Sequence, residues 1–292
     1  MLKTETPSTQ HTDLDLYPVQ DLVDALIDDQ ALAAQAVKAA SASISAAVEA
    51  MAPRIAAGGR LIYVGAGTSG RLGILDSVEL YPTFSWPHER AVAMLAGGLG
   101  AMFEAVEGAE DDRSKGAADL RLLYPTYNDV ILLVAASGTT PYVVGALQSA
   151  RAVGSLSIGI ANNAGTPLLA GADIGILLDT GPELISGSTR LKAGTAQKIA
   201  LNTLSTALMV RLNKTYCNLM VDLHATNVKL IERTIHLTMH ATGVDADTAR
   251  AALEQCQHQV KVAIVMLLKK QTAEQAQALL DHNNGNVRAA LK

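Results

Sequence analysis

Residues 61–70 read LIYVGAGTSG, four apolar residues followed by a turn rich in Gly, Thr and Ser. The apolar run is short, includes the β-branched residues Ile62 and Val64, and ends at a glycine. These features are typical of a buried β-strand. Since a helical stretch follows, the segment predicts a strand, a loop and a helix, which is the start of a βαβ unit.

The same pattern recurs along the chain. Short apolar runs closed by Gly, Ser or Asn alternate with helical stretches, which predicts a parallel sheet with crossover helices. One such helix is expected from Pro141 to about Ala152, because proline fits a first helical turn. The fold class is therefore α/β, with a doubly wound parallel five-stranded sheet whose strands cover residues 61–64, 92–95, 130–134, 156–160 and 174–178.

Helical sequence flanks this sheet. Residues 19–57 carry apolar positions at helical spacing, and residues 192–211 and 225–240 also favour helices. Turn signals after residue 242 predict a small three-helix cap, and the polar first twelve residues are expected to be flexible or to lie on a partner surface. The expected domains are an N-terminal helical segment (1–50), a sheet domain (51–214) and a C-terminal helical region with the cap (215–292).

The composition excludes several classes of protein. The net charge is −5 and no long Lys/Arg run occurs, which argues against a nucleic-acid or membrane partner. Cys217 and Cys256 are too far apart in sequence to suggest a disulfide framework or a zinc knuckle. No signal peptide is evident, and no apolar run reaches the ~20 residues of a membrane span. We expect a cytoplasmic protein with a small ligand.

The spacing Gly65-x-Gly67-x-x-Gly70 matches the dinucleotide-binding pattern. An NAD site also needs an acidic residue at the end of the second strand to hold the ribose, and residues 96–98 are Ala-Gly-Gly. An NAD-dependent enzyme is therefore a minor alternative.

Hydroxyl side chains follow two of the predicted strands. Thr68 and Ser69 follow the first strand, and Ser137, Thr139 and Thr140 follow the third. Both loops are expected at the carboxyl edge of the sheet, where helix N-termini offer free N–H groups to an anion. Any one of these hydroxyls is better explained as an ordinary helix cap. Two such loops together predict a site for a phosphate monoester.

Over nearly its whole length the sequence resembles the sugar isomerase (SIS) domain family, and within it the N-acetylmuramic acid 6-phosphate etherases. The matching segments are residues 65–76, 106–112, 135–138, 187–198, 218–222 and 225–227. The resemblance implies a SIS-type fold and a phosphorylated amino sugar as substrate. It also implies removal of the C2 proton, loss of D-lactate from C3 and addition of water, which needs two proton-transfer groups and no metal or other cofactor.

By this resemblance Glu79 and Glu110 are the catalytic pair, with Glu79 serving the lactyl oxygen and the incoming water and Glu110 acting at C2. From the residues alone, Glu79 is better explained as a solvated carboxylate at a helix end, and Glu110 as a member of an acidic N-terminal turn with Asp111 and Asp112. The cations Arg190 and Lys192 are expected to meet the lactyl carboxylate or the phosphate. The full set of expected substrate- and phosphate-binding residues is Gly67, Thr68, Ser69, Ser137, Gly138, Thr139, Thr140, Glu183, Ser188, Arg190 and Lys192.

Three segments depart from the family pattern. Val78, Leu80 and Tyr81 flank Glu79 where the family usually has Ser before the glutamate and Cys-Pro after it. Thr139 stands where the family usually has arginine, and the usual Arg-Asn-Pro does not follow Thr4-Glu5. The expected function is an etherase of cell-wall amino-sugar recycling that releases N-acetylglucosamine 6-phosphate and D-lactate and acts as a homodimer. The alternatives are a noncatalytic phosphosugar sensor and an aldose–ketose sugar-phosphate isomerase, and release of lactate distinguishes them.

Overall fold

The computed structural model describes residues 2–223 and 228–292. The chain forms two compact units. The first, here called the sheet unit, comprises Met1–Ser77 and His88–Ser205, and the second, the helical unit, comprises Val78–Pro87 and Thr206–Lys292. The domain boundaries expected from the sequence at residues 50 and 214 stay a prediction.

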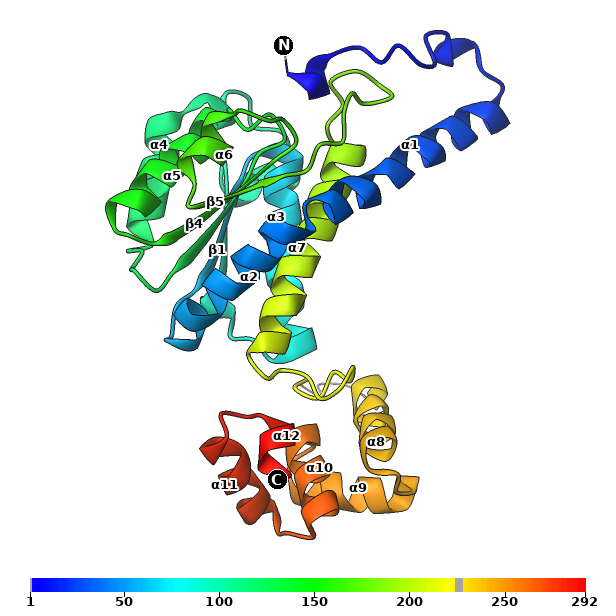
Figure 1. Ribbon diagram of the computed structural model, residues 1–292, viewed down its shortest axis with the longest axis vertical. Helices are drawn as coiled ribbons and strands as arrows, with labels where there is room; N and C mark the ends of the chain where they lie inside the picture. Colours follow the sequence, from blue (N-terminus) through cyan, green and yellow to red (C-terminus); the bar gives the residue numbers. More distant parts are fainter. Residues whose placement is uncertain (1, 224–227) are drawn as a thin grey trace. The chain divides into compact units, whose positions relative to one another are not determined.

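The sheet unit contains five parallel strands in the order β2-β1-β3-β4-β5 (Figure 1). Every residue of β1, β3 and β4 is buried, which explains why their sequences are continuous apolar runs. The predicted α/β fold with a doubly wound parallel sheet is confirmed. The strands are β1 (Leu61–Gly65), β2 (Ala91–Leu95), β3 (Val130–Val134), β4 (Leu156–Ala161) and β5 (Ile174–Leu177).

Helices cover both faces of the sheet (Figure 1). One layer consists of α4 (Arg113–Leu122), α5 (Pro141–Ala152) and α6 (Pro167–Gly171). The other consists of α2 (Ser41–Ala56), α3 (Gly67–Phe84) and α7 (Lys192–Arg211). The expected helices over 141–152 and 192–211 are thus confirmed.

Alternate residues of β1 face opposite layers, as the pleat of a strand requires. Ile62 and Val64 belong to the core shared with α4 and α5. Tyr63 instead donates a hydrogen bond to Asp76 on α3 (2.7 Å). The other carboxylate oxygen of Asp76 accepts hydrogen bonds from α7, namely from Asn202 (2.5 Å) and Ser205 (3.1 Å), so one buried carboxylate joins β1, α3 and α7.

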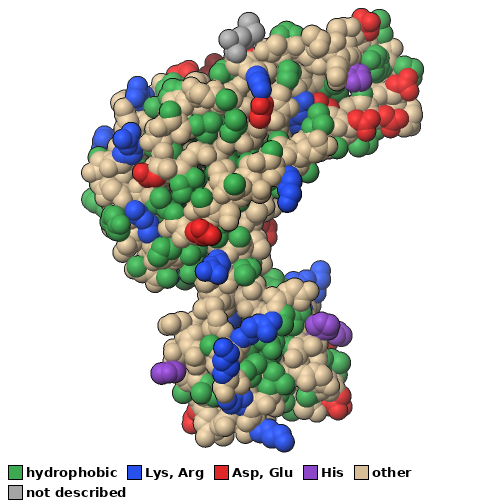
Figure 2. Space-filling view, viewed as in Figure 1, with side chains coloured by type: hydrophobic (Ala, Val, Ile, Leu, Met, Phe, Trp, Pro, Cys, Tyr) green, Lys and Arg blue, Asp and Glu red, His purple; other side chains and the backbone are tan. Residues whose placement is uncertain are grey.

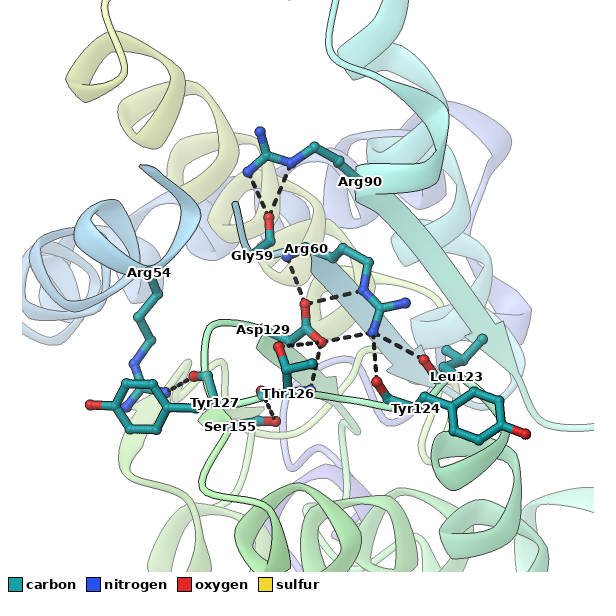
Figure 3. Close-up of polar contacts among 10 residues, drawn as sticks. All are labelled: Arg54, Gly59, Arg60, Arg90, Leu123, Tyr124, Thr126, Tyr127, Asp129 and Ser155. Carbon is teal, nitrogen blue, oxygen red and sulfur yellow. Dashed lines mark hydrogen bonds and ion pairs between the residues drawn. The ribbon is translucent and has the colours of Figure 1, made fainter. Parts of the chain in front are cut away.

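At the amino edge of the sheet, the carboxylate of Asp129 joins the starts of two strands (Figure 3). It accepts hydrogen bonds from the Arg60 guanidinium (2.7 Å) and from the backbone N–H groups of Arg60 and Thr126 (2.8 Å each). Burial raises the pKa of Asp129, but these hydrogen bonds outweigh it and hold the pKa below its ordinary value. Nearby, Arg90 donates to the carbonyl of Gly59 and so ties the start of β2 to the same edge.

The N-terminal residues are more ordered than their sequence predicts. Thr4 is fully buried, its N–H donates to Oδ1 of Asn163 at the end of β4 (3.3 Å), and Nδ2 of Asn163 donates to Oγ1 of Thr4 (3.0 Å). The expectation of a flexible or partner-bound first segment is therefore wrong at Thr4, because Asn163 supplies both matching partners. The helical lead-in is confirmed as α1 (Val19–Ala39) and α2.

No single helix within residues 2–223 and 228–292 is long and apolar enough to cross a membrane. The helices α1 and α2 satisfy that length and composition only as a pair, across a bend of 56°.

The helical unit has its own apolar core, to which α10 contributes more of the described buried residues than any other helix. Three helices of ten residues match the expected cap, and α12 adds a short fourth one. Residues 225–227, which the resemblance includes and at which a helix was expected to begin, lie outside the described residues. The helices are α8 (Val228–Thr242), α9 (Ala246–Gln255), α10 (Val260–Lys269), α11 (Ala273–His282) and α12 (Val287–Ala290).

Candidate functional site

The two hydroxyl-rich loops follow neighbouring strands. Gly65 at the end of β1 pairs in register with Val134 at the end of β3, so residues 66–70 and 135–140 leave the same edge of the sheet side by side. The chain then turns in opposite directions, since β2 lies on one side of β1 and β4 lies beyond β3. Ligands of open α/β sheets bind at such a switch in strand order.

The loop after β3 is shaped by Gly138. Its φ is +70°, and a Cβ atom there would lie 2.3 Å from Oγ1 of the buried Thr166. Within the loop the N–H of Thr139 donates to Oγ of Ser137 (3.2 Å), and the hydroxyls of Ser137 and Thr140 are 3.3 Å apart. Because the Thr140 side chain does not cap α5, the free N–H groups of its first turn are available to an anion.

The loop after β1 divides its hydroxyls between two roles. Gly67 is exposed and Thr68 is partly exposed, so both can meet a ligand. Ser69 is buried and donates to Oε1 of Gln197 on α7 (2.8 Å), and Nε2 of Gln197 donates to Oδ1 of Asn162 at the end of β4 (2.9 Å). The Ser69 hydroxyl therefore joins the loop to α7 and β4.

A cavity of about 240 Å³ opens beside the first turn of α3. Its wall includes Gly67 and residues 105–110. The last of these, Glu110, lies in the 3₁₀ turn η5 (Ala109–Asp111). This segment folds over the end of β2 because Gly97, with φ of +85°, leaves room for it: a Cβ there would lie 2.9 Å from Val106. η5 also packs against α5, which follows the loop after β3.

Arg71, the cationic residue among the described residues that line this cavity, was not among the expected site residues. Its Nε and Nη2 both donate to the carbonyl oxygen of Ala101 (3.1 and 2.8 Å), in the 3₁₀ turn η4 (Leu99–Met102) after β2. Arg71 lies inside the matching segment 65–76, yet nothing in the spacing links it to residues 101–110. Only the folded loop brings them together.

The two expected catalytic glutamates lie on different elements. Glu110 is exposed and lines the cavity. Glu79 is exposed on α3, twelve residues after Gly67, and is not among the described residues that line the cavity. Of the two residues that depart from the family pattern after Glu79, Leu80 is buried and Tyr81 is partly buried.

The remaining expected site residues gather at the start of α7. Glu183 is fully buried and accepts hydrogen bonds from the N–H groups of Lys192 (3.1 Å) and Ala193 (2.9 Å). Burial raises the pKa of Glu183, although these hydrogen bonds lower it. The ammonium of Lys192 forms a buried ion pair with Asp29 of α1 (2.5 Å). In this chain Glu183 and Lys192 thus hold α7 and α1.

Two other expected site residues, in the loop before α7, are more exposed than Glu183 and Lys192. Ser188 is partly exposed and Arg190 is exposed. Across the residues that the structure describes, no group of three His, Cys, Asp or Glu side chains could hold a metal ion.

Family models match two overlapping parts of the chain. The SIS domain model matches residues 105–207, and the model of the glucokinase regulatory protein N-terminal SIS domain matches residues 43–151. Solved structures share the fold. Phosphoheptose isomerases from Neisseria gonorrhoeae and Francisella tularensis superpose with a TM-score of 0.50 each, at 16% and 18% identity, over 66% of this chain and 98% of theirs.

Much higher identity is found among curated relatives. An N-acetylmuramic acid 6-phosphate etherase from Deinococcus radiodurans is 57% identical over 99% of this chain and 95% of its own length. The etherase of the same name from Enterobacter sp. is 46% identical over 100% of this chain and 98% of its own length. With this identity over the full length, the SIS fold and the loops at the sheet edge, the chain belongs to the N-acetylmuramic acid 6-phosphate etherase family.

Proposed function

We propose that this chain is a carbon–oxygen lyase that cleaves the lactyl ether of N-acetylmuramic acid 6-phosphate. The products are D-lactate and N-acetylglucosamine 6-phosphate, as expected in the recycling of cell-wall amino sugars. The observation that carries the proposal is the 57% identity over almost the whole chain to the Deinococcus radiodurans etherase. A carboxylate in a cavity next to a loop suited to phosphate supports it.

The reaction is an elimination followed by a hydration. In the open-chain sugar the aldehyde at C1 makes the C2 proton acidic, and Glu110 removes it. The electron pair forms the C2–C3 double bond, the C3–O bond breaks, and the lactyl oxygen takes a proton from Glu79. Glu79 then deprotonates a water that adds at C3, and C2 regains a proton from Glu110. Each carboxyl group contributes about 10²–10⁴ to the rate.

The phosphate binds at the loop after β3 in this proposal. The hydroxyls of Ser137, Thr139 and Thr140 and the open first turn of α5 supply neutral donors, with Gly138 shaping the loop. Gly67 and Thr68, in the neighbouring loop after β1, are proposed to contact the same ligand. Ser69, Glu183 and Lys192 act by positioning, since each holds α7 through the contacts described above. Ser188 and Arg190 remain candidates for direct contact.

We further propose a homodimer in which a second copy of the chain supplies Glu79. Glu79 stands twelve residues after Gly67 on α3 and does not belong to the described residues that line the cavity with Glu110. In addition, α1 exposes Val19, Val23 and Ile27 at four-residue intervals, an apolar stripe suited to a partner. Acidic side chains gather in the region of the first turns of α1 (Figure 2, in the same view as Figure 1). A cytoplasmic location stays a prediction.

Release of D-lactate tests the proposal. Purified protein incubated with N-acetylmuramic acid 6-phosphate is expected to release D-lactate and N-acetylglucosamine 6-phosphate. Glu79→Gln and Glu110→Gln are each expected to lower the rate about 10²-fold or more, whereas Glu254→Gln, at an exposed position of α9, serves as the control. No lactate from the unmodified protein contradicts the proposal. A ketose phosphate without lactate identifies an isomerase, and binding without turnover identifies a sensor.

A further inference from the structure

Arg71 places a cationic side chain in the wall of the cavity beside α3. Of the described residues that line this cavity, Arg71 is the one with a cationic side chain, while Glu107 and Glu110 bring two carboxylates. An anionic ligand entering beside two carboxylates is repelled unless a cation compensates them. An anionic group of a ligand in this cavity would therefore pair with Arg71.

The guanidinium is already held in place. Two of its five N–H groups donate to the carbonyl of Ala101, which leaves three for a ligand. A planar group fixed in this way loses little conformational freedom when it binds, and it fits a carboxylate through two parallel hydrogen bonds.

We propose that Arg71 binds the carboxylate of the lactyl substituent and so selects muramyl over other phosphosugars, an inference that rests on the proposed function. The lactyl group is attached at C3, next to the C2 atom that Glu110 serves, and Arg71 and Glu110 line the same cavity. The phosphate is on C6, three carbons further along the sugar, and it occupies the loop at residues 137–140.

Kinetics separate this role from a merely structural one. Arg71→Gln raises the KM for lactate release about 10- to 100-fold, as expected for the loss of a hydrogen-bonded ion pair. Arg71→Lys keeps the positive charge but lacks the planar guanidinium, and its KM is expected to lie between those of the unmodified protein and Arg71→Gln. Arg151→Gln removes an exposed arginine from the last turn of α5 and leaves KM unchanged.

Binding distinguishes the carboxylate from the phosphate. Calorimetric titrations compare Glu110→Gln with Glu110→Gln/Arg71→Gln, because the loss of Glu110 slows consumption of the substrate during the titration. The double variant binds N-acetylmuramic acid 6-phosphate about 10- to 100-fold more weakly and binds N-acetylglucosamine 6-phosphate, which lacks the carboxylate, within about twofold of the parent. Preserved binding of this second sugar also shows that the site remains folded.

Three results overturn the assignment: equal losses for both sugars, which place Arg71 at the phosphate, no loss for either sugar, or no binding of the muramyl sugar to the parent. These titrations need no turnover. A failure of the unmodified protein to release lactate therefore contradicts the proposed function separately.

Discussion

At the scale of single residues, Gly138 gives the most direct test of the loop after β3. Its φ of +70° and the 2.3 Å from an added Cβ to Thr166 both exclude a side chain. We expect Gly138→Ala to lower the free energy of unfolding by about 1–2 kcal/mol from backbone strain, and more from the clash. The displaced loop is also expected to weaken binding of N-acetylglucosamine 6-phosphate, measured by calorimetry.

Gly181 provides a matched control for this substitution. Its φ is also +70°, but an added Cβ would meet nothing within 4 Å. Gly181→Ala is expected to show the strain alone, with unchanged affinity for the sugar phosphate. Equal affinities of the two variants would contradict a phosphate site at residues 137–140.

Ser69 shows what the sequence could and could not predict about single site residues. Both hydroxyl-rich loops were identified from composition, and both lie at the predicted edge of the sheet. Sequence cannot distinguish an exposed hydroxyl from a buried one, because the partner of Ser69 is Gln197, 128 residues away. Arg71 was missed for the same reason, since its fixed position depends on Ala101 in another loop.

At the scale of elements, Asp129 joins the starts of β1 and β3. We expect Asp129→Asn to lower the free energy of unfolding by about 2–4 kcal/mol at pH 7, because Arg60 loses its buried partner. Folding lowers the pKa of Asp129. Its contribution to the free energy of unfolding is therefore fully present at a pH above the pKa of the unfolded chain, and it is lost as the pH falls through the lower pKa of the folded protein. Urea unfolding at pH 7 and at low pH measures both effects.

The difference in stability between the unmodified protein and Asp129→Asn is therefore expected to shrink as the pH falls below the ordinary range of aspartate. Asp247→Asn, at an exposed position in the first turn of α9, is the comparison. A difference that stays constant with pH would show that the ionised form of Asp129 is not what stabilises these strands.

The elements themselves were largely predictable, because strand and helix follow local periodicity. Predicted strand 130–134 coincides with β3, and the helix predicted from Pro141 coincides with α5. Thr4 was wrongly predicted because its burial comes from Asn163, which no local pattern can indicate.

At the scale of the whole molecule, the apolar stripe on α1 predicts self-association. Val23→Asp places a negative charge between Val19 and Ile27, at the centre of the stripe. Because this charge would be buried in the interface, the variant is expected to shift the dimer toward monomer in analytical ultracentrifugation. Gln35→Asp adds the same charge at another exposed position of α1 and is the control. A monomeric unmodified protein, or a dimer that both variants leave intact, would contradict an interface at this stripe.

The central proposal at this scale is that each active site takes Glu79 and Glu110 from different copies of the chain. One measurement tests it directly. Glu79→Gln and Glu110→Gln chains carrying different tags are co-expressed, and the mixed dimer is purified and assayed for D-lactate release. If each site takes Glu110 from one copy and Glu79 from the other, the mixed dimer contains one intact site and recovers about half of the unmodified activity. If the mixed dimer remains as inactive as either variant alone, the two glutamates do not meet across the dimer and the account is wrong.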